Sequence, residues 1–173
     1  MAYQRPQPVR AGTVPRIPKG VYKVLVREAT PETSKTSGNP MVVIKIEVVS
    51  PETVQFNGHT VKVVGAKATM YASFSEKAIG GTITFLDAMR VKLPPPAETM
   101  EQDIANMQEA AKELTGTLFQ MNLSSSAEEM KDSLGNPLLD NDGKPIMGQE
   151  QVDAAIFNVL PNTRTTLDGT PIA

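Results

Sequence analysis

Alternating apolar and polar positions dominate the chain from residue 20 to residue 71. In residues 20–28 two sets of positions alternate, with Tyr22, Val24 and Val26 in one set and Lys23, Leu25 and Arg27 in the other. A period of two places successive side chains on opposite faces of a strand, so a half-buried strand is predicted. Residues 40–49 and 60–71 are equally rich in valine and isoleucine, which favour pleated surfaces. Three consecutive strands are therefore predicted.

Turn-forming residues separate these strands. Residues 30–39 are a polar link whose last residues, Gly38 and Asn39, precede Pro40, a strong strand breaker. The Asn57-Gly58 step is a hairpin signal. Gly65, inside the third predicted strand, predicts a bulge or a sharp bend of the kind that curls a sheet toward a barrel.

The hydrophobic period becomes helical after residue 74. Residues 75–89 carry apolar side chains at helical spacing, although Gly80 and Gly81 weaken the pattern. Prolines 94–96 then break the chain. Residues 97–113 predict a clearer helix, with Thr99 as its cap. The apolar stripe of this second helix consists of Met100, Ile104, Met107, Ala111 and Leu114.

Two more strands are predicted at residues 117–123 and 152–160, and they are expected to pair with each other. A long, turn-rich link, residues 124–149, joins them, and no internal repeat is apparent. Residues 1–19 are rich in proline and arginine and are predicted to form a flexible arm. Residues 162–173 are predicted to be a polar tail.

The order of these elements predicts a mainly β fold with a helical insert (α+β). Three strands, a helical segment and two closing strands form the connectivity of the oligonucleotide/oligosaccharide-binding (OB) fold, a five-stranded barrel. The helices lie between strands three and four, and the domain covers residues 20–161. Such barrels commonly bind oligonucleotides around strands two and three, flanked here by the links 30–39 and 124–149.

Composition excludes several kinds of chemistry. The chain has no cysteine and a single histidine, His59, so a disulfide, a thiolate metal site and a site built from two imidazoles are all excluded. The run Asp140-Asn-Asp-Gly143 lacks the acidic residue that a calcium loop needs at the position of Leu138, and it is better explained as an Asx-Gly turn. No glycine-rich phosphate loop is present, and no carboxylate is spaced with a base or a nucleophile. We therefore expect no enzyme activity, no cofactor and no metal.

No apolar run approaches the roughly 20 residues of a membrane span, and the chain starts without an apolar signal segment. A cytoplasmic protein is expected.

The net charge of −2 hides an asymmetry along the chain. Residues 1–92 contain 13 basic and 6 acidic side chains, whereas residues 93–173 contain 4 basic and 13 acidic ones. The basic half is suited to a polyanion, and the acidic half can repel a polyanion or hold a basic partner. The basic half coincides with the three predicted strands.

Single-strand nucleic-acid binders need cations for the phosphates and flat side chains on which bases stack. Tyr22, Phe56, Tyr71 and Phe74 are the aromatic candidates, but Tyr22 alternates away from Lys23 and fits the core better. The predicted nucleic-acid-binding residues are Lys23, Arg27, Lys35, Lys45, Phe56, Lys62, Lys67 and Tyr71.

The run from Gly20 to Glu28, followed by Ser34-Lys-Thr-Ser-Gly-Asn-Pro40 and a hydrophobic second strand, resembles the start of bacteriophage single-stranded DNA-binding proteins of the OB type. Leu114-Thr-Gly116 and Asn158-Val-Leu-Pro161 are similar to the final hairpin of that family. The resemblance implies sequence-independent binding of single-stranded DNA during phage replication or recombination, in the host cytoplasm. It also implies a homodimer or higher homo-oligomer and contacts with replication or recombination proteins. The chain departs from the family in its sparse aromatics and in ending without an acidic tip.

A structural or assembly protein of a virion is the alternative. Such a protein would use the barrel as a scaffold and the proline-rich arm to hold its neighbours. Net acidity, few aromatic residues and long polar segments favour this alternative.

Overall fold

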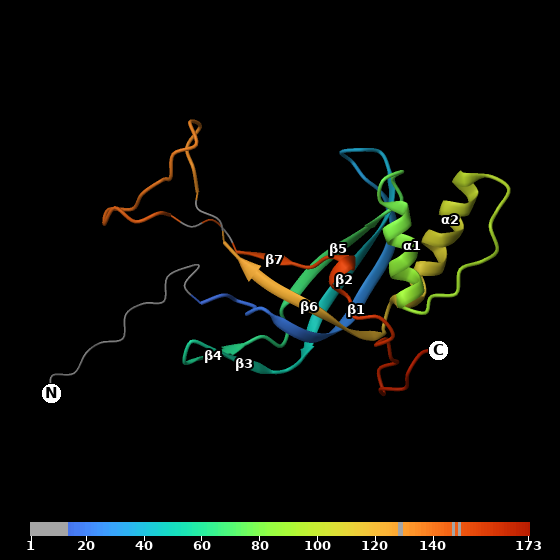
Figure 1. The fold of residues 1–173 in the computed structure, drawn as a ribbon, viewed down its shortest axis with the longest axis horizontal. Coiled ribbons are helices and arrows are strands. Elements are labelled where there is room, and N and C mark those ends of the chain that lie inside the picture. The colour runs from blue at the N-terminus through green and yellow to red at the C-terminus, as the bar shows by residue number, and fades with distance from the viewer. Residues whose placement is uncertain (1–13, 128–129, 147, 149) are drawn as a thin grey trace.

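The protein is mainly β, as the sequence predicts. The structure, a computed structural model, describes residues 14–127, 130–146, 148 and 150–173. Its strands are β1 (Gly20–Thr33), β2 (Pro40–Ser50), β3 (Thr53–Phe56), β4 (His59–Lys62), β5 (Lys67–Ser73), β6 (Leu118–Ser126) and β7 (Gln151–Asp153). Five of them form one antiparallel sheet in the order β5-β2-β1-β6-β7, and β3 and β4 form a separate hairpin. The sheet curls into a nearly closed barrel with two short helices at one end (Figure 1).

Strand β1 is longer than predicted because a bulge allows it to bend. Its register with β2 shifts between Val26 and Glu28, and Arg27 is left without a Cα partner. Before the bulge β1 pairs with both β2 and β6, and beyond it β1 pairs with β2 alone. Pro31, which has no N–H to donate, is tolerated on this open edge. The link predicted at residues 30–39 is therefore only a tight turn at residues 34–39.

The predicted second strand is confirmed as β2, but the predicted third strand is two strands. Asn57 and Gly58, with φ of 45° and 80°, form the turn of the β3–β4 hairpin, so this turn prediction is confirmed. Gly65 has φ of 87° and lies between β4 and β5. Its backbone turns there while its N–H donates to the Val48 carbonyl at 2.8 Å. Of the two predicted alternatives, a bulge or a sharp bend, the bend is present, and it lies between two separate strands.

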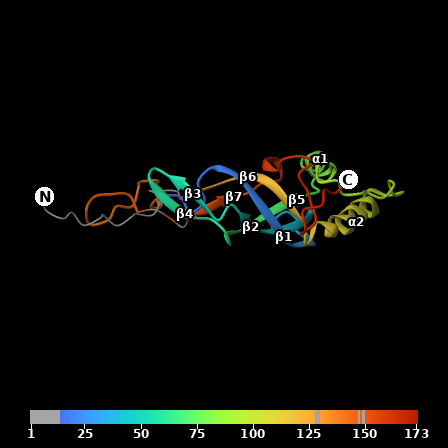
Figure 2. The ribbon, with the colours of Figure 1, turned by 90° about the horizontal axis from the view of Figure 1, so that it is seen from below.

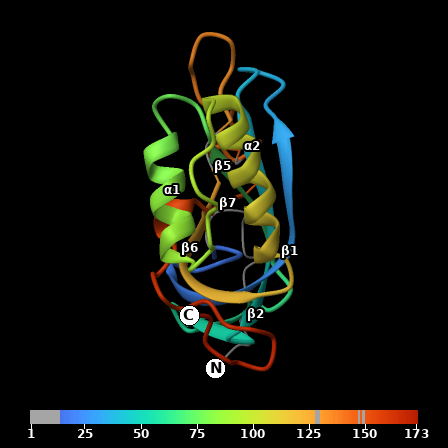
Figure 3. The same cartoon turned by 90° about the vertical axis from the view of Figure 1, so that its right-hand side faces the viewer.

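Both predicted helices are present, as α1 (Ile79–Ala88) and α2 (Met100–Ala110), and α2 continues into the 3-10 turn η1 (Ala111–Leu114). The Thr99 hydroxyl accepts a hydrogen bond from the Gln102 N–H at 3.2 Å, which confirms the predicted cap. The helices lie side by side across one end of the barrel (Figure 3). Their buried side chains join those of the strands in one core. Met100, which was predicted to belong to the apolar stripe, is 73% exposed and borders a pocket.

The predicted closing strand, residues 152–160, is wrong over most of its length. Only β7 is a strand, and it pairs with residues 124–126 of β6. Residues Ile156–Asn158 instead form the 3-10 turn η2, which places Ile156 in the core. A single bridge between Val159 and Met121 remains of the predicted pairing with residues 117–123.

The polar segment 162–173 packs against the barrel. Arg164 is only 3% exposed, although no sequence pattern distinguishes it from a surface arginine. Its guanidinium donates to the Glu113 carbonyl (2.7 Å), the Met89 carbonyl (3.1 Å) and the Thr117 hydroxyl (3.0 Å). Burial lowers the pKa of Arg164, and the charge of Glu113 opposes this shift. One buried cation thus ties the helical end to the start of β6.

One type of six-residue turn occurs three times among the described residues. The three copies cover residues 132–137, 140–145 and 166–171. In each copy the fourth residue is a glycine with positive φ, whose N–H donates to the carbonyl of the first residue at 3.0–3.1 Å. The Asp140 carboxylate also accepts from the Asp142 and Lys144 N–H groups, which confirms the Asx turn. The first two copies form a lobe at the end of the molecule opposite the helices (Figure 2).

Candidate nucleic-acid interface

The outer face of the sheet carries five of the eight predicted binding residues. Alternation along the strands buries Tyr22, Val24, Ile44 and Met70 on the inner face and exposes the residues between them. The exposed residues of β1, β2 and β5 include Lys23, Arg27, Lys45, Lys67 and Tyr71. We call these five residues the cationic face.

Strand register brings three members of this face together. Lys45 on β2 pairs with Thr69 on β5, so Lys67 and Tyr71 are its two diagonal neighbours. Diagonal neighbours in an antiparallel pair lie roughly 7–8 Å apart between Cα atoms, within reach of long side chains. Lys45 therefore lies between a second lysine and an aromatic ring.

A shallow depression of about 450 Å³ lies among these side chains. Its lining residues are Arg27, Lys45, Ile46, Lys67, Ala68 and Thr69. Arg27 reaches it from β1 at the bulge, the place where an extra residue re-aims a side chain. Three cations from three neighbouring strands thus surround one open hollow, an arrangement suited to an anionic group.

Two carboxylates accompany the cations. The Arg27 guanidinium forms an ion pair with Glu47, and the Lys45 ammonium lies 3.5 Å from a Glu28 carboxylate oxygen. A hydrogen bond from the Thr30 hydroxyl (2.8 Å) and then the charge of Lys45 lower the pKa of Glu28. Neither carboxylate was among the predicted binding residues. Alternation put Glu47 on the face of Lys45, whereas Glu28 comes beside Lys45 only through the register shift at the bulge.

The aromatic candidates divide between surface and core. Tyr71 is 60% exposed on the cationic face, where a base has access to its ring. Tyr22 is 2% exposed and its hydroxyl donates to the Pro18 carbonyl, which confirms it as a core residue; burial raises the pKa of its phenol. Phe74 is also buried, in the wall between the sheet and the helices. Only Tyr71 among these three is placed for stacking.

The remaining three predicted residues lie elsewhere. Lys35 is in the β1–β2 turn, next to the helices, whereas Phe56 and Lys62 belong to the β3–β4 hairpin at the other end of the barrel (Figure 1). Within that hairpin Phe56 shares a face with Val54 and is half-buried, and Lys62 pairs with Thr53 on the opposite face. None of the three lines the depression.

The His, Asp and Glu side chains in the described part of the chain form no group of three or more that could hold a metal ion. None of its helices has the length and apolar character needed to cross a lipid bilayer. The chain matches no protein-family model, and a search of curated proteins finds no match either. The geometry of the cationic face therefore carries the functional argument.

Proposed function

We propose that this protein binds single-stranded DNA without regard to sequence, through the cationic face, and that it has no enzymatic activity. The observation that carries the proposal is the position of Lys45 between its diagonal neighbours Lys67 and Tyr71. Lys45, Lys67 and Arg27 together line the depression. This arrangement supplies the two elements of single-strand recognition, cations for phosphates and an exposed ring for a base.

The fold supports the same proposal. Strands β1, β2 and β5, followed by two helices and β6, fit the first four strands of an OB barrel, and the cationic face lies where OB proteins bind oligonucleotides. The resemblance of residues 20–49 to phage single-stranded DNA-binding proteins points to replication or recombination in the host cytoplasm, and to a homo-oligomer.

A fluorescence titration with oligo-dT tests the proposal. Binding should weaken steeply between about 50 and 300 mM salt, because each neutralised phosphate contributes a slope of about −0.7 in log K against log salt. Removing two phosphate contacts with the double variant Lys45→Glu/Lys67→Glu should therefore flatten the slope by about 1.4 and weaken binding at least tenfold at low salt.

The matched control is Lys92→Glu/Lys112→Glu, which reverses two exposed lysines near the helices. Thermal melting should show that both double variants are folded. Absence of wild-type binding at low salt, or an equal loss in the control, would contradict the proposal.

One observation favours the alternative role in virion assembly. Several large apolar side chains are exposed outside the cationic face, among them Leu134, Leu139, Phe157 and Leu167. Burying such residues between copies of the chain would stabilise an assembly. A stable high-order oligomer in light scattering, together with no oligo-dT binding at low salt, would favour this role instead.

A further inference from the structure

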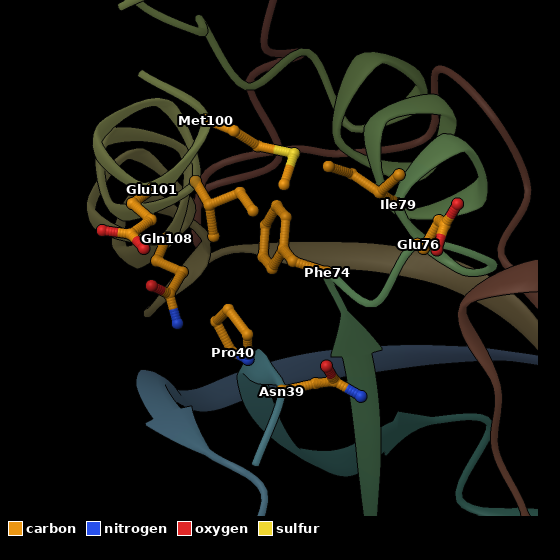
Figure 4. A pocket seen from close by; sticks show the side chains of 9 residues that line it. Asn39, Pro40, Phe74, Glu76, Ile79, Met100, Glu101 and Gln108 are labelled. Atoms are coloured by element: carbon orange, nitrogen blue, oxygen red, sulfur yellow. The ribbon is translucent and has the colours of Figure 1, made fainter. Parts of the chain in front are cut away.

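A second candidate site lies between the two helices and the β1–β2 turn. It is a pocket of about 690 Å³ (Figure 4). Apolar side chains form most of its walls: Pro40, Phe74, Ile79, Met100 and Ile104. Pockets of several hundred cubic ångströms with apolar walls are typical of ligand and side-chain binding sites.

The floor of the pocket consists of buried core residues, whereas its mouth is exposed. Phe74 and Ile104 are buried members of the core. The Gln108 side chain donates to the Met41 carbonyl (2.9 Å) and the Glu32 carbonyl (3.3 Å), and so holds α2 against the start of the sheet. Met100 stands at the mouth, largely exposed, and its flexible thioether side chain suits a variable apolar contact.

The rim of the pocket is acidic. Glu76, just before α1, and Glu101, in the first turn of α2, line it from different sides (Figure 4). Asn39 and Gln108 add amide groups, and no lysine or arginine is among its lining residues. Such a rim repels phosphates and attracts cations. The pocket is therefore unsuited to the polyanion proposed for the cationic face.

We propose that this pocket binds a basic peptide segment of a partner protein, with one bulky apolar side chain inserted beside Phe74 and flanking lysine or arginine side chains paired with Glu76 and Glu101. The volume has ample room for one leucine- or phenylalanine-sized side chain with adjoining backbone, and the charges are complementary. The proposal goes beyond DNA binding and does not depend on it.

Methyl NMR tests the proposal directly at the pocket. The protein is labelled with carbon-13 at its methionine methyl groups, and the Met100 signal is assigned with Met100→Leu. The probe is the peptide Lys-Lys-Gly-Leu-Gly-Lys-Lys, added to about 1 mM because short peptides bind weakly. The Met100 signal should shift with saturation. The signal of Met130, an exposed methionine that is hydrogen-bonded through its backbone to Leu138 and Ile146 and does not line the pocket, should not move.

Two matched peptides and two variants sharpen the result. Replacing the central leucine by serine, or all four lysines by glutamate, should abolish the shift. Glu76→Gln/Glu101→Gln should weaken binding about fivefold at low salt, the effect of losing two exposed ion pairs. Glu98→Gln/Glu109→Gln removes two exposed carboxylates that do not line the pocket and should leave binding unchanged.

Absence of any Met100 shift at the highest peptide concentration would overturn the proposal. Equal binding of the glutamate peptide would also overturn it, since the pocket would then be a general apolar site. No nucleic acid is present in this experiment, so its outcome is separate from that of the oligo-dT titration.

Discussion

The cationic face and the acidic pocket differ in what explains their charges. Glu101 lies in the first turn of α2, beside the Thr99 cap, where a carboxylate stabilises the positive end of the helix dipole. The lysines of the cationic face have no comparable role, because lysine is a poor strand former. Lys45 and Lys67 are also diagonal neighbours of like charge. Folding therefore accounts for part of the acidic charge and for little of the basic charge, and function is inferred with more force from the cationic face.

The pocket has a different feature that folding does not explain. Met100 is a large apolar side chain left in solvent at the mouth of an apolar hollow, whereas Ile104 and Met107, on the same helix, are buried. The exposed apolar side chain at the pocket and the clustered cations on the cationic face thus single out different partners. The first favours an apolar contact and the second a polyanion.

The largest expected effect is a loss of stability when Arg164 is removed. Arg164→Ala leaves the buried Met89 carbonyl and the partly buried Glu113 carbonyl without this donor. Each unsatisfied buried group costs about 1–3 kcal/mol, so the free energy of unfolding should fall by about 3 kcal/mol. Urea denaturation measures this change. Lys112→Ala, which removes an exposed cation on η1, should cost less than about 0.5 kcal/mol.

The same variant also shows whether the two regions depend on each other. At temperatures where Arg164→Ala remains folded, oligo-dT binding should be nearly unchanged, since the guanidinium contacts the helical end and the start of β6 and not the depression. A large loss of DNA binding in the folded Arg164→Ala variant would show that the geometry of the cationic face depends on the contacts that Arg164 makes at the helical end.

A smaller effect is expected when the two exposed aromatic rings are compared. Base stacking is worth about 1–3 kcal/mol per ring, so Tyr71→Leu should weaken oligo-dT binding about tenfold. Phe157 is 79% exposed and packs its ring over Gly81 of α1, away from the cationic face. Phe157→Leu should therefore leave the affinity unchanged. Equal effects in the two variants would indicate nonspecific apolar contact with DNA instead of stacking on the cationic face.

Features that depend on neighbouring residues could be predicted from the sequence, whereas features that depend on distant residues could not. The Asn57-Gly58 turn, the Thr99 cap and the strand alternation are set by neighbouring residues, and each was predictable. The bulge at Arg27 was not, because it depends on β1 pairing with two different strands. The burial of Arg164 was not either, because its three acceptors lie 47 to 75 residues away along the chain.

The candidate site likewise contains residues that the sequence pattern predicted and residues that it grouped wrongly. Parity along β1 predicted that Lys23 and Arg27 lie opposite Tyr22, and the structure adds Lys45 and Lys67 to their face. Phe56 and Lys62 were grouped with these residues, but they belong to the separate β3–β4 hairpin, which no local pattern distinguished from the sheet. The turn repeat could have been found from the eight-residue spacing of Asp132 and Asp140, each followed by glycine and proline at the same intervals.

The smallest effect concerns the carboxylates within the cationic face. Glu47 holds Arg27 in an ion pair and must give it up, at least in part, when a phosphate binds. Glu47→Gln should therefore strengthen oligo-dT binding about threefold at low salt, because an ion pair whose arginine is largely exposed is worth about 0–1 kcal/mol. The gain should shrink as salt rises, since screening weakens the pair and the phosphate contact alike.

The matched change at the other end of the molecule is Glu109→Gln, which breaks the Lys112–Glu109 pair at 2.9 Å. It alters the net charge of the protein by the same amount as Glu47→Gln but leaves the cationic face untouched. If both variants strengthen DNA binding equally, the total charge of the protein governs affinity. If only Glu47→Gln does so, the local competition between Glu47 and a phosphate for Arg27 governs it, as the geometry of the depression leads us to expect.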